Sequence, residues 1–146
     1  MLPSSKNEIL DATQIDATKE EIFQDTEWWT ADDINSFQRN TTSAKKVVEE
    51  WKQTGCVYSV SYKGNEFFAR YQFDSMYKPR PVIKAVLDAY GACTDTWSIA
   101  AWFHFRNGWI SNDDTIRPSP VAPKDALDQR EAIINAARNR QGTYVA

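Results

Sequence analysis

The expected fold is decided by one stretch of the sequence, Val57-Tyr58-Ser59-Val60-Ser61-Tyr62-Lys63-Gly64-Asn65-Glu66-Phe67-Phe68-Ala69-Arg70-Tyr71. Both ends of this stretch are rich in aromatic and β-branched residues, which are typical of strands. The tripeptide 63–65 between them has the composition of a tight turn. The stretch therefore predicts a β-hairpin with Lys63 at its tip.

Two short helices are expected before the hairpin. Thr30 is a suitable N-cap, and Asp33 can complete a capping box for a first helix that ends near Phe37. The second helix, over about 41–53, is predicted by a single apolar stripe of Ala44, Val47, Val48 and Trp51. Two helices joined by a short turn form a helix-turn-helix, and a hairpin directly after them is a wing.

Three further helices are expected after the hairpin. They cover the segment from Pro81 to Gly91, then Thr96–Phe105 capped by Thr94 or Asp95, and finally about Lys124–Arg140, with a loop over Asn107–Pro123. The run 99–103 is apolar nearly all round, so its helix should be sandwiched in the core or in an interface.

The predicted fold class is mainly α with a small β-hairpin. It consists of an N-terminal winged helix-turn-helix and a C-terminal helical domain. We expect three regions: residues 1–26 as an acidic polar tail or loosely docked arm, 27–78 as the winged module, and 79–146 as the helical domain.

Positive charge is concentrated in the middle third of the chain. Residues 1–38 carry 2 basic and 9 acidic side chains, residues 39–84 carry 9 and 4, and residues 85–146 carry 6 and 7, for a net charge of -3. A segregated basic patch can attract a phosphate backbone, because remote acidic groups are screened beyond about 8 Å. The same asymmetry would also allow the acidic N-terminal segment to fold back on the basic module.

The second helix of the pair is the one that would enter a DNA major groove. The alternative is a simple solvated helix face, because Glu49 and Glu50 can pair with the lysines four residues before them. The expected DNA contacts are Arg39, Thr42, Ser43, Lys45, Lys46 and Lys63.

Catalysis and metal binding are not expected. The lone His104 has no second histidine, cysteine or carboxylate at metal-ligand spacing in its own helix, so a satisfied core or interface histidine is favoured. Cys56 and Cys93 stand 37 positions apart and neither belongs to a Cys-x-x-Cys pair, so both are expected to be reduced and structural. The sequence shows no phosphate-binding glycine loop, nucleophile elbow or buried carboxylate pair, so we expect no enzyme, no catalytic residue and no cofactor.

A cytoplasmic location is expected from the same sequence. No run approaches the roughly 20 apolar residues needed to span a bilayer. The segment 1–8 also lacks the basic start and the apolar stretch of a signal peptide.

The hairpin and several later motifs together resemble the Xre/MbcA/ParS antitoxins. The resemblance spans about residues 27–140 and is carried by Tyr71-Gln72-Phe73-Asp74, Arg80-Pro81, Asn107-Gly108-Trp109, Arg117-Pro118 and the Ala-rich last helix. It implies an N-terminal part that binds operator DNA and a C-terminal part that dimerises and binds a toxin. The usual toxin is of the RES type, which consumes nicotinamide adenine dinucleotide.

The resemblance and the local chemistry predict a partner-binding surface. A Pro-rich loop with an aromatic residue and an arginine, followed by a helix with arginines on its polar side, would suit a pocket that holds an anionic dinucleotide. The expected contacts are Trp109, Arg117, Arg130, Arg138 and Arg140. Alternatively, Arg117 caps a neighbouring helix and the last helix packs within a dimer.

The predicted function is a DNA-binding antitoxin that neutralises a RES-type toxin by direct binding and autoregulates its operon. We expect it to be a homodimer built on the C-terminal helices, because the apolar run 99–103 is hard for one chain to cover. Two alternatives remain open: a winged-helix regulator or excisionase-like accessory protein with no toxin partner, and an adaptor that no longer touches DNA.

Overall fold

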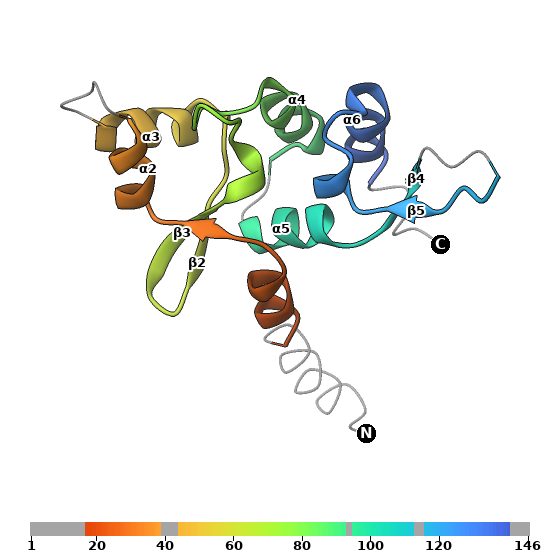
Figure 1. Cartoon of the computed structure of the whole chain (residues 1–146), viewed down its shortest axis with the longest axis horizontal. Coiled ribbons are helices and arrows are strands. Elements are labelled where there is room, and N and C mark those ends of the chain that lie inside the picture. The colour runs from red at the N-terminus through yellow and green to blue at the C-terminus, as the bar shows by residue number, and fades with distance from the viewer. Residues whose placement is uncertain (1–16, 39–43, 93–94, 113–115, 141–146) are drawn as a thin grey trace.

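The computed structural model describes residues 17–38, 44–92, 95–112 and 116–140 (Figure 1). A helix over residues 17–25, called here the N-terminal helix, comes first. It is followed by β1 (Trp28–Trp29), α2 (Ala31–Phe37), α3 (Ala44–Gln53), β2 (Val60–Tyr62), β3 (Asn65–Ala69) and the 3₁₀ turn η1 (Arg70–Gln72). The second half contains α4 (Pro81–Tyr90), α5 (Thr96–His104), β4 (Asn107–Ser111), β5 (Pro120–Val121), η2 (Pro123–Asp125) and α6 (Arg130–Arg138).

This is a mixed α/β fold, so the prediction of a mainly α winged helix-turn-helix followed by a helical domain is wrong. The described residues form six α-helices and two small antiparallel sheets, one with strand order β1-β3-β2 and one that pairs β4 with β5. The error has a physical reason. Strands of two residues are too short to show a period of two, and β4 and β5 contain Gly108 and Pro120, which are typical of loops.

The three-stranded sheet separates two hydrophobic clusters. Trp28 pairs with Ala69 and Trp29 with Phe68, and because side chains alternate along a strand, the two tryptophans face opposite sides of the sheet. Trp28 and Ala69 belong to the larger cluster, and Trp29 and Phe68 belong to the smaller one. The sheet is therefore the middle layer of the N-terminal half.

The smaller cluster is closed by α2 and α3. The expected capping box is confirmed, since Thr30 Oγ1 accepts from the Asp33 N–H and the Asp33 carboxylate accepts from the Thr30 N–H. Ile34 of α2 and Val48 of α3 are fully buried against Phe68. The two helices thus pack on one face of the sheet.

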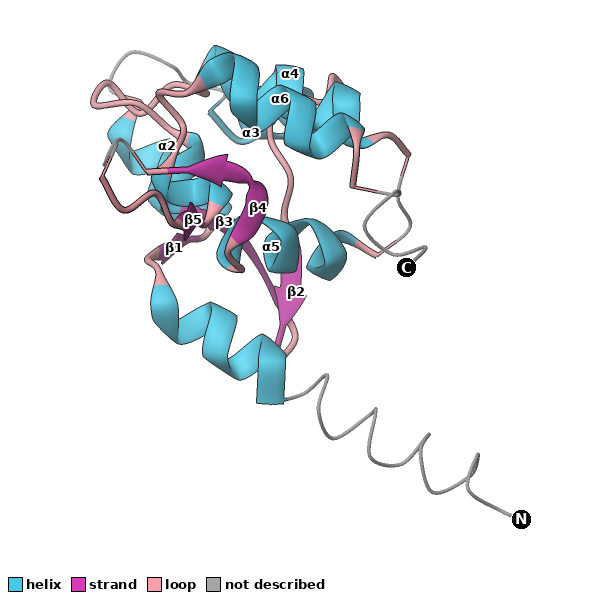
Figure 2. Cartoon of the chain, turned by 90° about the vertical axis from the view of Figure 1, so that its right-hand side faces the viewer, coloured by secondary structure: helices cyan, strands magenta, loops and turns pink. Residues whose placement is uncertain are grey.

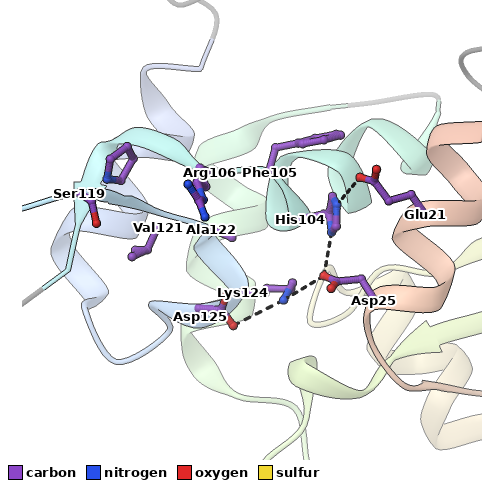
Figure 3. Close-up of a pocket in the computed structure, with 11 residues that line it drawn as sticks. Glu21, Asp25, His104, Phe105, Arg106, Ser119, Val121, Ala122, Lys124 and Asp125 are labelled. Carbon is purple, nitrogen blue, oxygen red and sulfur yellow. Dashed lines mark hydrogen bonds and ion pairs between the residues drawn. The ribbon is translucent and has the colours of Figure 1, made fainter.

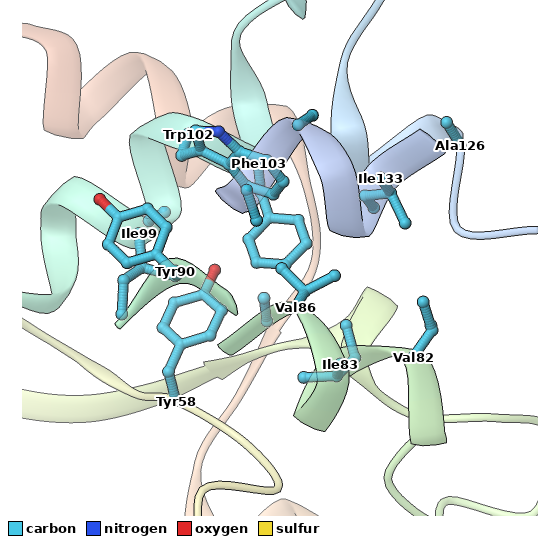
Figure 4. Close-up of a cluster of buried hydrophobic side chains, with 14 of the residues drawn as sticks. Tyr58, Val82, Ile83, Val86, Tyr90, Ile99, Trp102, Phe103, Ala126 and Ile133 are labelled. Atoms are coloured by element: carbon cyan, nitrogen blue, oxygen red, sulfur yellow. The ribbon is translucent and has the colours of Figure 1, made fainter. Parts of the chain in front are cut away.

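The larger cluster joins α4, α5 and α6 to the other face of the sheet (Figure 4). Phe103 of α5 is fully buried and stacks on Tyr58, and Ile83 and Ile133 fill the space between α4 and α6. Most of the apolar run 99–103 is buried within the chain itself. The expected sandwiched position of α5 is confirmed, and a dimer is not needed to cover it.

The N-terminal helix packs against the body of the protein. Its Ile22 is 3% exposed and belongs to the larger cluster, beside Tyr58 and Ala100. Figure 2 shows this helix on the opposite side of α5 from α4 and α6. The part of the expected acidic arm that the structure describes is therefore a docked helix, whereas residues 1–16 lie outside the described chain.

Within the described residues, none of the helices combines the length and the apolar character that crossing a membrane requires.

Candidate functional site

A cleft of about 790 Å³ opens where four parts of the fold meet (Figure 3). The N-terminal helix forms one wall, the end of α5 a second, and β5 with η2 the rest. The side chains that define it are Glu21, Asp25, His104, Arg106, Val121 and Lys124.

His104 lies between two carboxylates of the N-terminal helix. Its Nε2 is 2.7 Å from Glu21 Oε2, and its Nδ1 is 2.8 Å from Asp25 Oδ2. Ionised carboxylates only accept hydrogen bonds, so both bonds form together when both ring nitrogens carry a proton. The imidazolium form of His104 therefore fits this geometry.

Lys124 completes the cluster from the other side. Its Nζ is 3.1 Å from Asp25 Oδ2 and 3.5 Å from Asp125 Oδ1, and its side chain is 16% exposed. Partial burial acts to raise the pKa of Asp25, but the hydrogen bonds from Lys124 and His104 outweigh it. The pKa of Asp25 consequently lies below its ordinary value.

The mouth of the cleft carries an exposed cation and an exposed ring. Arg106 makes no hydrogen bond or ion pair with any residue of the described chain. Phe105 is 46% exposed and meets the His104 ring edge to face at 4.7 Å. These two side chains remain available to a ligand.

The cluster is suited to binding and positioning. Both ring nitrogens of His104 are engaged with carboxylates, so neither is left to accept a proton from a substrate or to coordinate a metal. The described part of the chain contains no group of three or more His, Cys, Asp or Glu side chains that could hold a metal ion.

The site was missed from the sequence because His104 finds its carboxylates outside its own helix. Glu21 and Asp25 are four residues apart, and this spacing places both on one face of a helix. That pattern was a usable signal for a paired carboxylate site. The two carboxylates lie 83 and 79 positions from the histidine in the chain, and no local pattern indicates such contacts.

Of the elements expected to contact DNA, α3 and the β2–β3 turn do not form one end of the molecule, since in Figure 1 α2 and α3 lie above the three-stranded sheet and the turn lies below it. Lys63 is exposed at the turn with φ +50°, beside Gly64 at φ +83°. Arg39, Thr42 and Ser43 lie outside the described residues. Lys45 and Lys46 belong to the first turn of α3, and their side chains lie outside the described part.

The expected partner contacts are spread over two regions. Trp109 on β4 is 54% exposed, and Arg117 is exposed before β5. Arg130 and Arg138 stand at opposite ends of α6, about 12 Å apart at a rise of 1.5 Å per residue.

Arg140 packs against its own chain. Its guanidinium carbon lies 3.8 Å from the centre of the Tyr90 ring, and its Nε donates to the Tyr90 carbonyl at 3.0 Å. The structure therefore does not gather the three arginines 130, 138 and 140 into one patch.

Comparison with solved structures finds a likeness in fold. The chain is similar to the NMR structure of Rv2175c, with a TM-score of 0.61, 15% sequence identity, and coverage of 80% of this chain and 82% of that one. At this identity the likeness concerns the fold alone. No protein-family model matches the chain, and no curated protein matches it.

Proposed function

We propose that this protein is a DNA-binding antitoxin with two separate binding ends. One end, the N-terminal half with α3 on one side of the three-stranded sheet and Lys63 at the β2–β3 turn, contacts operator DNA and so autoregulates the operon. The other end, around β4 and β5, binds a partner protein, in the expected case a RES-type toxin in the cytoplasm. Both activities are binding, and neither requires catalysis.

The observation that carries the proposal is the exposure of apolar side chains at the β4–β5 end. Trp109 is 54% exposed, Ile116 is 87% exposed, and Phe105 nearby on the chain is 46% exposed. Large exposed apolar groups mark protein interaction sites, and tryptophan is enriched among the residues that dominate such interfaces. Arg106, next to Phe105, and Arg117, next to Ile116, add polar contacts.

The DNA-binding end is supported by the placement of basic residues. Lys45 and Lys46 occupy the first turn of α3, and in DNA-reading helices the N-terminal residues contact the base edges. The acidic Glu49 and Glu50 lie further along α3, and the lysine in its last turn, Lys52, is paired with Glu49 and Glu66. Lys63 adds an exposed charge at the hairpin turn.

A homodimer remains part of the proposal, because a two-fold pair would present two DNA-binding ends to a palindrome. Its surface must differ from the one expected from sequence, since α5 is covered by its own chain. Surfaces on α6 and on the β4–β5 sheet are still exposed.

Co-expression with the RES-type toxin encoded beside its gene tests the proposal. The variant Trp109→Ser with Ile116→Ser should lose protection of the cells, whereas Met76→Ser should protect fully. Met76 is a matched control because it is 72% exposed and lies on the loop after η1, away from β4 and β5 in the chain. Full protection by a folded double variant would refute the β4–β5 surface.

The gene neighbourhood separates the competing functions. If no toxin gene is adjacent and the protein still binds its own promoter, the regulator without a toxin partner is the correct function.

A further inference from the structure

The N-terminal helix contacts the rest of the protein through aromatic rings, a hydrogen bond and ion pairs. Its nine residues carry one lysine and three carboxylates. Among them only Ile22 is buried, while Phe23 and the charged side chains make their contacts at the surface. Among its described residues the helix therefore has one core anchor, Ile22, and otherwise contacts the body through partly buried and exposed side chains.

Phe23 inserts into an aromatic slot. Its ring stacks on Tyr62 at 4.1 Å and on Trp28 at 5.3 Å, and it meets the edge of Phe67 at 5.0 Å. One helical turn earlier, Lys19 lies over the Trp97 ring at 5.7 Å. Aromatic contacts of this geometry add to the free energy gained from burial alone.

All three carboxylates of the helix are bound by the body. Glu20 accepts a hydrogen bond from the Tyr62 hydroxyl. Glu21 and Asp25 hold His104, and Asp25 also pairs with Lys124 (Figure 3). The receiving groups come from β2, α5 and η2, which are well separated in the chain.

These ionic contacts hold the helix only weakly. The side chains of Glu21 and Asp25 are 61% and 40% exposed, and exposed ion pairs contribute little to stability. The helix is, however, attached to β1 through Thr26 and Glu27 alone, and a short tether gives a high effective concentration. Its occupancy thus depends on the burial of Ile22, the ring contacts of Phe23 and the short tether more than on the ion pairs.

We infer that Tyr62, Phe67, Trp97, His104 and Lys124 form a docking site for an acidic amphipathic helix of another protein. The chain's own helix, with the pattern Glu20-Glu21-Ile22-Phe23-Gln24-Asp25, occupies the site until a partner helix with the same pattern displaces it. The site lies apart from α3 and does not include Trp109 or Ile116, but it adjoins the proposed DNA contact Lys63, whose Nζ lies 5.2 Å from the centre of the Tyr62 ring. It adds a third binding surface beyond the proposed function.

The inference is tested on the full chain with a labelled synthetic peptide of residues 15–27. In the variant Glu21→Lys with Asp25→Lys, the tethered helix loses its ion pairs and faces two cations. The peptide should then bind at least about tenfold more tightly than it binds the unmodified protein, measured by fluorescence anisotropy. The control Ala17→Lys adds one positive charge at an exposed position of the same helix outside the pattern 20–25, and it should leave peptide binding unchanged.

A third substitution, which reverses the charge on the receiving side, should undo the effect of the double variant. Adding Lys124→Glu to the double variant places a carboxylate opposite the cation introduced by Asp25→Lys, and it should return peptide affinity to the level of the unmodified protein.

Circular dichroism melting curves show that each variant is folded. The inference is overturned if the peptide binds no folded variant, or if the double variant and the unmodified protein bind it equally. It is also overturned if a labelled oligo-dT of about 15 nucleotides, a length that one single-strand-binding module can cover, binds the double variant as tightly as the peptide does. The surface would then be a nucleic-acid site.

Discussion

The side-chain amide of Gln72 makes the two hydrogen bonds with the Tyr58 backbone that a neighbouring strand would otherwise make. Gln72 Oε1 accepts from the Tyr58 N–H at 2.8 Å, and Gln72 Nε2 donates to the Tyr58 carbonyl at 3.0 Å. Gln72 is fully buried, so water cannot replace these bonds. One side chain therefore satisfies the backbone of Tyr58 just before β2 begins.

Substituting Gln72→Met should destabilise the protein strongly. Methionine has a similar volume but leaves both backbone groups of Tyr58 unsatisfied, at a cost of about 2 to 5 kcal/mol. Urea unfolding followed by tryptophan fluorescence measures this loss. The exposed Gln53→Met is the matched control and should change the free energy of unfolding by less than about 0.5 kcal/mol. Equal stability of the two variants would show that Gln72 does not support the Tyr58 backbone.

Stability should fall in acid partly through Asp25. Its folded pKa lies below the unfolded value of about 3.9, so its contribution is fully present above about pH 5 and is lost as the pH falls through the folded pKa. Asp25→Asn should therefore reduce stability at about pH 7 and have much less effect near pH 2.5. Urea unfolding at both pH values checks this, and an equal loss at both would contradict the ionic role of Asp25.

Lys63→Glu should weaken binding to a fragment of the protein's own promoter. Each lost phosphate contact lowers the slope of log affinity against log salt by about one unit. The control is Arg138→Glu, because Arg138 is exposed at the end of α6, in the other half of the molecule from α3. Gel shifts at several salt concentrations measure the slope. Identical slopes for the unmodified protein and Lys63→Glu would remove this residue from the interface.

Arg140→Ala should lower stability by about 1 to 2 kcal/mol, because the guanidinium lies over the Tyr90 ring and also donates to its carbonyl. Arg138→Ala should have little effect, since that side chain is exposed and, among the described residues, bonds only to Asn135 of its own helix. Thermal melting of both variants distinguishes them. A stability unaffected by Arg140→Ala would leave this arginine available to a partner, as expected from the sequence.

Local signals in the sequence predicted the starts of α2, α4 and α5 well, but the last helix, expected from about Lys124, begins at Arg130 after the 3₁₀ turn η2. The capping box of Thr30 and Asp33, the cap of Asp95 and the Pro81 start of α4 all appear in the structure. These features depend on residues within one turn of each other, which is the range over which caps and apolar stripes act.

The β2–β3 hairpin with Lys63 at its turn was predicted and is confirmed, but β1, β4, β5 and the cleft could not be predicted in the same way. Trp28–Trp29 becomes a strand only because Phe68 and Ala69 lie beside it, and that pairing joins segments far apart in the chain. His104 likewise acquires its carboxylates from the N-terminal helix. Both are tertiary contacts, and residue spacing along one segment does not encode them.

The two-faced sheet also determines how the chain should unfold. Trp28 and Trp29 are adjacent in sequence yet belong to different clusters, and Phe67 and Phe68 divide in the same way. Both clusters pack on the same strands, β1 and β3, from opposite faces. If one cluster unfolds, these strands lose the packing on one face, and the other cluster is destabilised. We therefore expect that cutting the chain near residue 78, the boundary predicted from the sequence, does not give two independently folding pieces. We expect a single cooperative transition, in which tryptophan fluorescence and far-UV circular dichroism change at the same urea concentration.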